Sequence, residues 1–445
     1  MFLTNIKTIF HKRVVTAFGL FALSIPVYSQ FLALSGEKSL SGWSQITTTK
    51  YSIIYPKGLD SLGMRYADAF ETYYRLLGAS AGYYPGQLKS APLPVVLHTR
   101  YPDGNGVADI APSRLELFTM GDPYGRLFNI PFDKMLAIHE GRHAAQFQFS
   151  RDGSWDWPKV LFGESLSFYV SRLYANVALL EGDAVVMETA LTDGGRGRTA
   201  SFLEYYRMAL DRNDYRNWFR WRYGSQRYYT PDYYKIGYMT VAGTRYLSNR
   251  WDFTKNYLSR STRIFSFHAF EKTLLDYSHT GINNSWIQIA DAFRTIWTED
   301  DKVRGPFQNV ERLVADNSRF FPNYKSLVQT ADGRLMAVRS DMDKTMELVE
   351  ILPDGKENHV RYFNAASKLA YSAATNCIYW SESLIDTRWG MYGISRVRQL
   401  KVGSKAYRTL LRMASLSALL CRPMARPWPL YSSLRTEQAV WLSWI

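Results

Sequence analysis

The pattern of residues changes near Pro306, and this change limits the folds that the chain can adopt. From about Thr199 to Trp297 the sequence predicts mainly helices and is rich in aromatic residues, as in RNWFRWRYGSQRYYTPDYY (216–234). Such density is typical of packing between helices or of a peptide groove. After Pro306, short alternating segments are separated by turn sequences such as ADG and PDG, which predicts antiparallel strands. Since 445 residues are too many for one typical core, we expect two or three domains.

The strand pattern after Pro306 repeats. Residues 325–357, KSLVQTADGRLMAVRSDMDKTMELVEILPDGKE, predict three strands, and residues 368–397 follow the same order about 40 residues later, with CIYWSE in the place of LMAVRS. A repeat of this length with several short strands is typical of a propeller blade, but a closed propeller has at least about four blades. We therefore assign 307–400 to a partial β-propeller of about two blades.

The net charge of +14 is concentrated at the two ends of the chain. Residues 387–445 contain ten Lys/Arg and a single acid, residues 1–29 contain three basic residues and no acid, and the rest is nearly neutral. This distribution argues against nucleic-acid binding. Residues 401–445 also lose the turn sequences, and two explanations stay open: an out-of-frame extension of a truncated propeller, or a genuine basic helical tail.

The N-terminus has the pattern of a signal peptide. A basic region ending at Arg13 is followed by an apolar run to about Val27, and cleavage is expected between Ser29 and Gln30. The run is shorter than the ~20 apolar residues of a bilayer span, and no later segment predicts one. We therefore expect an exported protein, whether periplasmic, outer-membrane-associated or secreted. With only two cysteines it would not depend on a disulfide framework.

The mature chain begins with alternating strands and helices. Residues 51–56, 92–100 and 114–120 predict strands, and residues 64–78 predict a helix closed by Gly78. We expect a small mixed sheet, followed by a helical subdomain, within a domain that covers 30–306.

The segment AIHEGRHAAQF (137–147) contains the residues of a zinc hydrolase site. Pro131 and Asp133 suit the first turn of a helix, and residues four apart lie on one helical face, so His139 and His143 can direct their imidazoles at one ion. Glu140 lies beside them as a candidate general base for a zinc-activated water. We therefore predict Zn²⁺ as the cofactor.

A zinc site of this kind needs a third protein ligand, and two carboxylates are candidates. Glu181 lies in LLEGDAVVMETAL (179–191), where helical spacing turns it inward. Glu164 lies in VLFGESLSFYVS (160–171), where Ser and Gly favour a surface or capping role. Asp183 and Glu188 can either orient the imidazoles or pair with an arginine.

The motifs HEGRHAAQ and EGDAVVMET together resemble those of the gluzincin metallopeptidases, the peptidase MA-like group with thermolysin-like and aminopeptidase-N-like members. The resemblance implies that His139, His143 and Glu181 bind zinc and that Glu140 is the general base. The interval of 38 residues between His143 and Glu181 exceeds the usual interval of about twenty, which Glu164 fits better. We favour Glu181 for its local context, with the additional residues forming an inserted helix.

The same resemblance suggests further roles. The aminopeptidase-like branch uses a tyrosine in a Y-x-x-G context to stabilise the oxyanion, and here Tyr234 precedes Gly237 by three positions. A strand just before the histidine helix, here 114–120, borders the cleft in this fold and can hold an extended peptide at its edge. GRGR (195–198) is similar to exported members that carry a C-terminal TolB-like or WD-type propeller.

The sequence thus favours an α+β gluzincin-like zinc metallopeptidase with a peptide or protein substrate. The alternative is a non-catalytic periplasmic or surface binding protein with a degenerate peptidase domain, which the long ligand interval and the incomplete propeller would suit. The remaining histidines outside the signal peptide have no ligand partner at a suitable spacing, so we assign them structural roles: His98, His268, His279 and His359.

Overall fold

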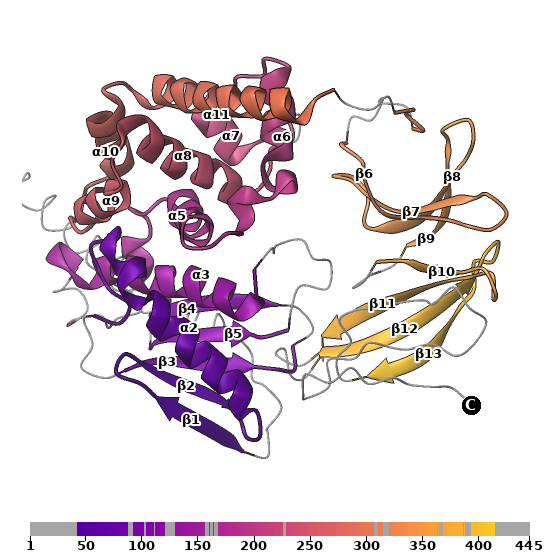
Figure 1. Ribbon diagram of the computed structural model, residues 1–445, viewed down its shortest axis with the longest axis horizontal. Coiled ribbons are helices and arrows are strands. Elements are labelled where there is room, and N and C mark those ends of the chain that lie inside the picture. Colours follow the sequence, from indigo (N-terminus) through magenta and orange to yellow (C-terminus); the bar gives the residue numbers. More distant parts are fainter. Residues whose placement is uncertain are drawn as a thin grey trace, which may run out of the picture.

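The structure, a computed structural model, describes residues 42–87, 92–101, 104–110, 112–120, 130–155, 160, 163, 168–225, 228–306, 310–314, 320–362, 364, 368–385, 387 and 393–413. In these ranges the protein is a mixed α+β structure (Figure 1). The predicted signal peptide, Glu164 with most of its segment, and residues 414–445 lie outside the described residues.

A five-stranded mixed sheet forms the base of the N-terminal half. Its strand order is β1-β2-β3-β5-β4, with β2, β3 and β5 parallel and the two outer pairings antiparallel. The strands are β1 (Trp43–Thr47), β2 (Tyr51–Pro56), β3 (Leu93–His98), β4 (Asn105–Ile110) and β5 (Ser113–Phe118). The three inner strands bury alternate residues, because one face of the sheet packs on helices and the other does not.

The expectation that residues 114–120 border the cleft as a sheet edge is wrong. β5 pairs with β3 on one side and with β4 on the other, so the edge strand is β4. The alternating sequence of β5 shows that one of its faces is buried. An inner strand and an edge strand have the same alternation, so the sequence pattern does not distinguish them.

Helix α3 (Phe132–Gln146) contains both motif histidines and lies between the sheet and the helices that follow (Figure 1). Helix α2 (Asp60–Ala79) packs beside it, and the two share one apolar core with the sheet. Every residue of α3 from Met135 to Gln146 is buried. Its polar side chains therefore need partners inside the protein, because a buried polar group without a hydrogen bond is costly.

The remaining helices of this half form a second apolar core on the far side of α3 from the sheet (Figure 1). They are α5 (Val177–Ala190), α6 (Ala200–Asp211), α7 (Trp218–Tyr223), α8 (Tyr233–Ser248), α9 (Phe253–Ser261), α10 (Ala269–Ser278) and α11 (Ile282–Arg304). The predicted aromatic packing is confirmed, since Trp218, Trp221 and Trp286 are all at most 1% exposed in this core.

The predicted strand repeat is confirmed as two four-stranded antiparallel sheets, each with its strands in sequential order. The first contains β6 (Asn323–Gln329), β7 (Leu335–Ser340), β8 (Glu347–Ile351) and β9 (Glu357–Tyr362). The second contains β10 (Ala370–Ser372), β11 (Cys377–Ile385), β12 (Gly393–Lys401) and β13 (Tyr407–Met413). Leu348 and Trp380 lie in one core that both sheets share, and the strand pattern continues past Lys401.

Candidate metal centre

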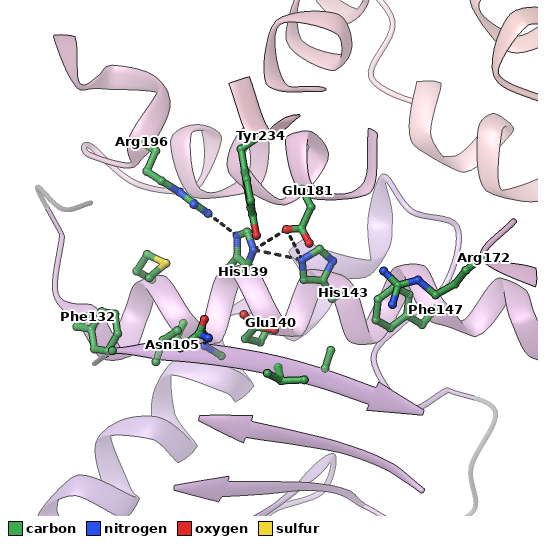
Figure 2. A pocket seen from close by; sticks show the side chains of 16 residues that line it. Asn105, Phe132, His139, Glu140, His143, Phe147, Arg172, Glu181, Arg196 and Tyr234 are labelled. Atoms are coloured by element: carbon green, nitrogen blue, oxygen red, sulfur yellow. Dashed lines mark hydrogen bonds and ion pairs between the residues drawn. The ribbon is translucent and has the colours of Figure 1, made fainter. Parts of the chain in front are cut away.

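Three side chains from two helices converge on one point in the structure (Figure 2). Helix α3 places His139 and His143 one turn apart, and α5 places Glu181 opposite them. The Glu181 Oε2 atom lies 3.2 Å from His139 Nε2 and 3.0 Å from His143 Nε2, and the two Nε2 atoms are 3.1 Å apart. The structure thus brings together the three residues that the sequence nominated as ligands.

The donor atoms suit a zinc ion. Bonds of about 2.0–2.1 Å at tetrahedral angles place two ligand atoms about 3.3 Å apart, which is close to the three separations in the protein. The charges agree, because the site favours positive charge. Burial and Arg196 oppose a charge on His139, but hydrogen bonds to Glu181 and Glu188 outweigh them and raise the pKa of His139. Burial opposes ionisation of Glu181, yet the histidines hold the pKa of that carboxyl well below its usual range.

Each histidine is oriented by a hydrogen bond from its second ring nitrogen. His139 Nδ1 lies 2.7 Å from Glu188 Oε1, and His143 Nδ1 lies 2.8 Å from Gln146 Oε1. Each acceptor can take a proton from Nδ1, which would leave the Nε2 lone pair available for a metal, and Arg196 also lies 2.8 Å from His139 Nδ1 (Figure 2). Gln146 is itself fixed, because its amide donates to the Leu180 carbonyl at 2.9 Å.

Glu188 and Asp183 resolve the alternatives that the sequence left open. Glu188 does both things, since it accepts from His139 and also pairs with Arg196, whose Nε lies 3.0 Å from Oε2. Asp183 pairs with arginines, Arg142 at 2.6 Å and Arg245 at 2.8 Å, and reaches His143 only through Gln146. The two carboxylates therefore support the two histidines by different routes.

Glu140 faces the pocket from α3 beside the convergent ligands (Figure 2). Among the described residues none donates a hydrogen bond to its carboxylate, and burial raises its pKa. The edge strand β4 passes close to it, because a Cβ atom on Gly106 would lie 2.4 Å from Glu140 Cγ. Only glycine leaves room for Glu140 at this point of the strand.

Tyr234 reaches the site from the first turn of α8. Its ring lies 6.2 Å from that of His139, and Figure 2 shows its hydroxyl directed toward His139 and Glu181. Burial, followed by the charge of Glu181, raises the pKa of Tyr234, so the hydroxyl keeps its proton at neutral pH. The guanidinium of Arg196 lies over the same ring at 5.1 Å.

A close crossing of α5 and α8 brings Tyr234 and Glu181 together. A Cβ atom on Gly237 would lie 1.7 Å from the Ala178 carbonyl oxygen, and one on Gly182 would lie 2.0 Å from the Gly237 carbonyl carbon. The glycine of the Y-x-x-G sequence is therefore required by backbone contact between two helices.

We expect Gly237→Ala to force α8 away from α5 and to lower the free energy of unfolding by about 1–3 kcal/mol. Urea unfolding of the variant and of the unchanged protein measures this difference. Gly281→Ala is the control, because nothing lies within 4 Å of a Cβ atom at that position. Equal stability of the Gly237 variant and the unchanged protein would contradict the crossing.

The pocket around these residues has a volume of about 260 Å³. Gly104 and residues 105–108 of β4 form one wall, and α3 forms the floor. Arg196 stands at one end, Tyr234 lies beside His139, and Arg172 and Phe147 stand at the other end (Figure 2). The pocket is thus an open cleft bounded by an edge strand, with a cation at each end.

Several residues of the site were not predicted from the sequence: Gly106, Gln146, Arg172 and the pairing of Arg196 with Glu188. Gln146 had a usable signal, since it follows His143 by three positions on the same helix. The histidines assigned structural roles lie outside the pocket, and three of them pair with a glutamate: His98 with Glu116, His268 with Glu271 and His359 with Glu347.

No protein-family model, curated protein or solved structure matches this chain. Within the described part of the chain, no helix combines the length and the apolar character needed to cross a membrane.

Proposed function

We propose that the protein is an exported zinc metallopeptidase of the gluzincin type. The observation that carries this proposal is the convergence of His139 Nε2, His143 Nε2 and Glu181 Oε2 in one pocket with the Glu140 carboxylate. A structural cluster would not need two imidazoles with their Nε2 atoms turned toward one carboxylate oxygen. Nor would it need a buried glutamate left without a hydrogen-bond donor from the described residues.

The side chains have distinct roles in this proposal. Zinc, held by His139, His143 and Glu181, would polarise the scissile carbonyl and lower the pKa of a water molecule. Glu140 takes the proton of the attacking water on its carboxylate and later delivers it to the leaving amine. Its raised pKa suits a group that must both accept and release a proton. Tyr234, which stays protonated, donates a hydrogen bond to the oxyanion.

The substrate of this proposal is an extended peptide. Among the described strands, β4 pairs with β5 alone, so its other edge can form main-chain hydrogen bonds with a peptide that lies along the cleft. The same strand contains Gly106, which lies close to Glu140, so a peptide along this edge would lie near Glu140. We further propose that the two four-stranded sheets are blades of a β-propeller, as their sequential strand order suggests.

The zinc content of the full-length protein tests the site. We expect about one zinc ion per chain by elemental mass spectrometry, lost in Glu181→Ala and retained in Glu164→Ala. Glu204→Ala, at an exposed position of α6, controls for the loss of a negative charge. If Glu164→Ala lost zinc and Glu181→Ala kept it, the third zinc ligand would be Glu164 and not Glu181.

The same measurement separates the proposal from its alternative. A folded protein that takes up no zinc when metal is supplied would refute the metallopeptidase. A protein that binds zinc but cleaves no member of a broad peptide library would favour the non-catalytic binding protein.

A further inference from the structure

The two arginines of the pocket differ in what holds them. Arg196 is committed, because it pairs with Glu188 and thereby supports His139. Arg172 lines the other end of the pocket, beyond His143, and its side chain is exposed (Figure 2). No carboxylate among the described residues forms an ion pair with it, and Asp109 of the neighbouring strand β4 pairs with Arg114 instead.

Two aromatic rings hold the Arg172 guanidinium in place. It lies 5.6 Å from the centre of the Phe147 ring and 5.4 Å from that of Phe168, and the two rings contact each other at 5.1 Å. Phe147 in turn stacks on His143, with ring centres 5.6 Å apart. These ring contacts link the guanidinium to His143, while no carboxylate among the described residues occupies its N–H groups.

A guanidinium of this kind suits one type of partner. Contact with two aromatic rings restricts the positions of the planar group, so less entropy is lost when it binds. Its N–H groups match the two oxygens of a carboxylate in a pair of parallel hydrogen bonds. The other carboxylates of the pocket, Glu140 and Glu181, have roles in the proposed reaction.

We propose that Arg172 is a specificity residue that binds a carboxylate of the substrate at the His143 end of the cleft. This inference rests on the proposed function, because it requires a peptide in the pocket. The carboxylate is either an acidic side chain of the peptide or the α-carboxylate at its C-terminus. Both sources offer Arg172 a carboxylate. An acidic side chain would let the peptide continue past Arg172, whereas an α-carboxylate would mean that the peptide ends there.

Binding tests the proposal without requiring turnover. Three fluorescent peptides are titrated into the full-length, zinc-supplied Glu140→Gln protein. The first has an internal glutamate and an amidated C-terminus, and the second, which is neutral, has glutamine in that place and an amidated C-terminus. The third has glutamine and a free C-terminus. We expect one carboxylate-bearing peptide to bind about tenfold more tightly than the neutral one, and the tighter of the two identifies the source.

Substitution of Arg172 tests whether this residue causes the tighter binding of the carboxylate-bearing peptide. We expect Arg172→Met, in the same Glu140→Gln background, to reduce the tenfold ratio to about one, and Arg172→Gln to do the same. Arg220→Met, at an exposed position of α7, removes the same charge elsewhere and is expected to keep the ratio. The proposal is overturned by equal binding of all three peptides, by a preference that survives both Arg172 variants, or by equal loss in Arg220→Met.

The failure of the proposed function has a different signature. The unchanged protein is assayed in parallel for cleavage of all three peptides and of a broad peptide library. Absence of cleavage with a preserved binding ratio would refute the peptidase and retain the carboxylate site. Cleavage without a binding preference would retain the peptidase and refute the role of Arg172.

Discussion

Glu140→Gln is expected to lower kcat for peptide hydrolysis by about 10²–10⁴-fold while the protein keeps about one zinc ion per chain. The substitution preserves the shape of the side chain but removes its ability to take a proton. Zinc should remain, because Glu140 is not among the three convergent groups, whose donor atoms come from His139, His143 and Glu181. The variant therefore separates loss of the proposed general base from loss of the proposed metal.

The control for this experiment is Glu204→Gln, which makes the same chemical change at an exposed position of α6. Its kcat and zinc content should match those of the unchanged protein. Peptide cleavage by Glu140→Gln at the full rate would remove Glu140 from the mechanism. Loss of zinc in that variant would instead mean that Glu140 contributes to the metal site.

The parts of the site that the sequence predicted are those that follow from local periodicity. His139 and His143 lie on one face because the helix repeats every 3.6 residues, whatever surrounds it. Glu181 was favoured for its helical context, and the structure places its carboxylate opposite the histidines. Tyr234 was nominated from a three-residue spacing, and the structure gives that spacing a cause in the contact of Gly237 with Ala178.

The parts that the sequence could not supply depend on contacts between segments that are distant in the chain. Nothing local to Arg196 distinguishes an arginine that pairs with Glu188 from one in solvent. Likewise the alternation of β5 reports a buried face but gives no information on which strand pairs beside it, so the edge was assigned to the wrong strand. Arg172 became a candidate only through the rings of Phe147 and Phe168 beneath it.

The second large effect concerns stability and comes from the buried carboxylate behind His143. Asp183 is fully buried and accepts hydrogen bonds from Arg142, Gln146, Arg245 and Thr254 at 2.6–2.8 Å. Burial opposes its charge, but the two arginines outweigh this and lower the pKa of Asp183 to about 2. The Arg142 side chain is itself fully buried. The two guanidinium groups thus depend on this one carboxylate for their neutralisation among the described residues.

Asp183→Asn should therefore lower the free energy of unfolding by about 3–5 kcal/mol, because it keeps the shape of the side chain but leaves two buried or nearly buried arginines without an opposing charge. Urea unfolding followed by tryptophan fluorescence measures the change. Asp193→Asn makes the same substitution at an exposed position after α5 and is expected to shift stability by less than about 0.5 kcal/mol. If Asp183→Asn proved as stable as the Asp193 variant, solvent rather than Asp183 would have to screen Arg142 and Arg245.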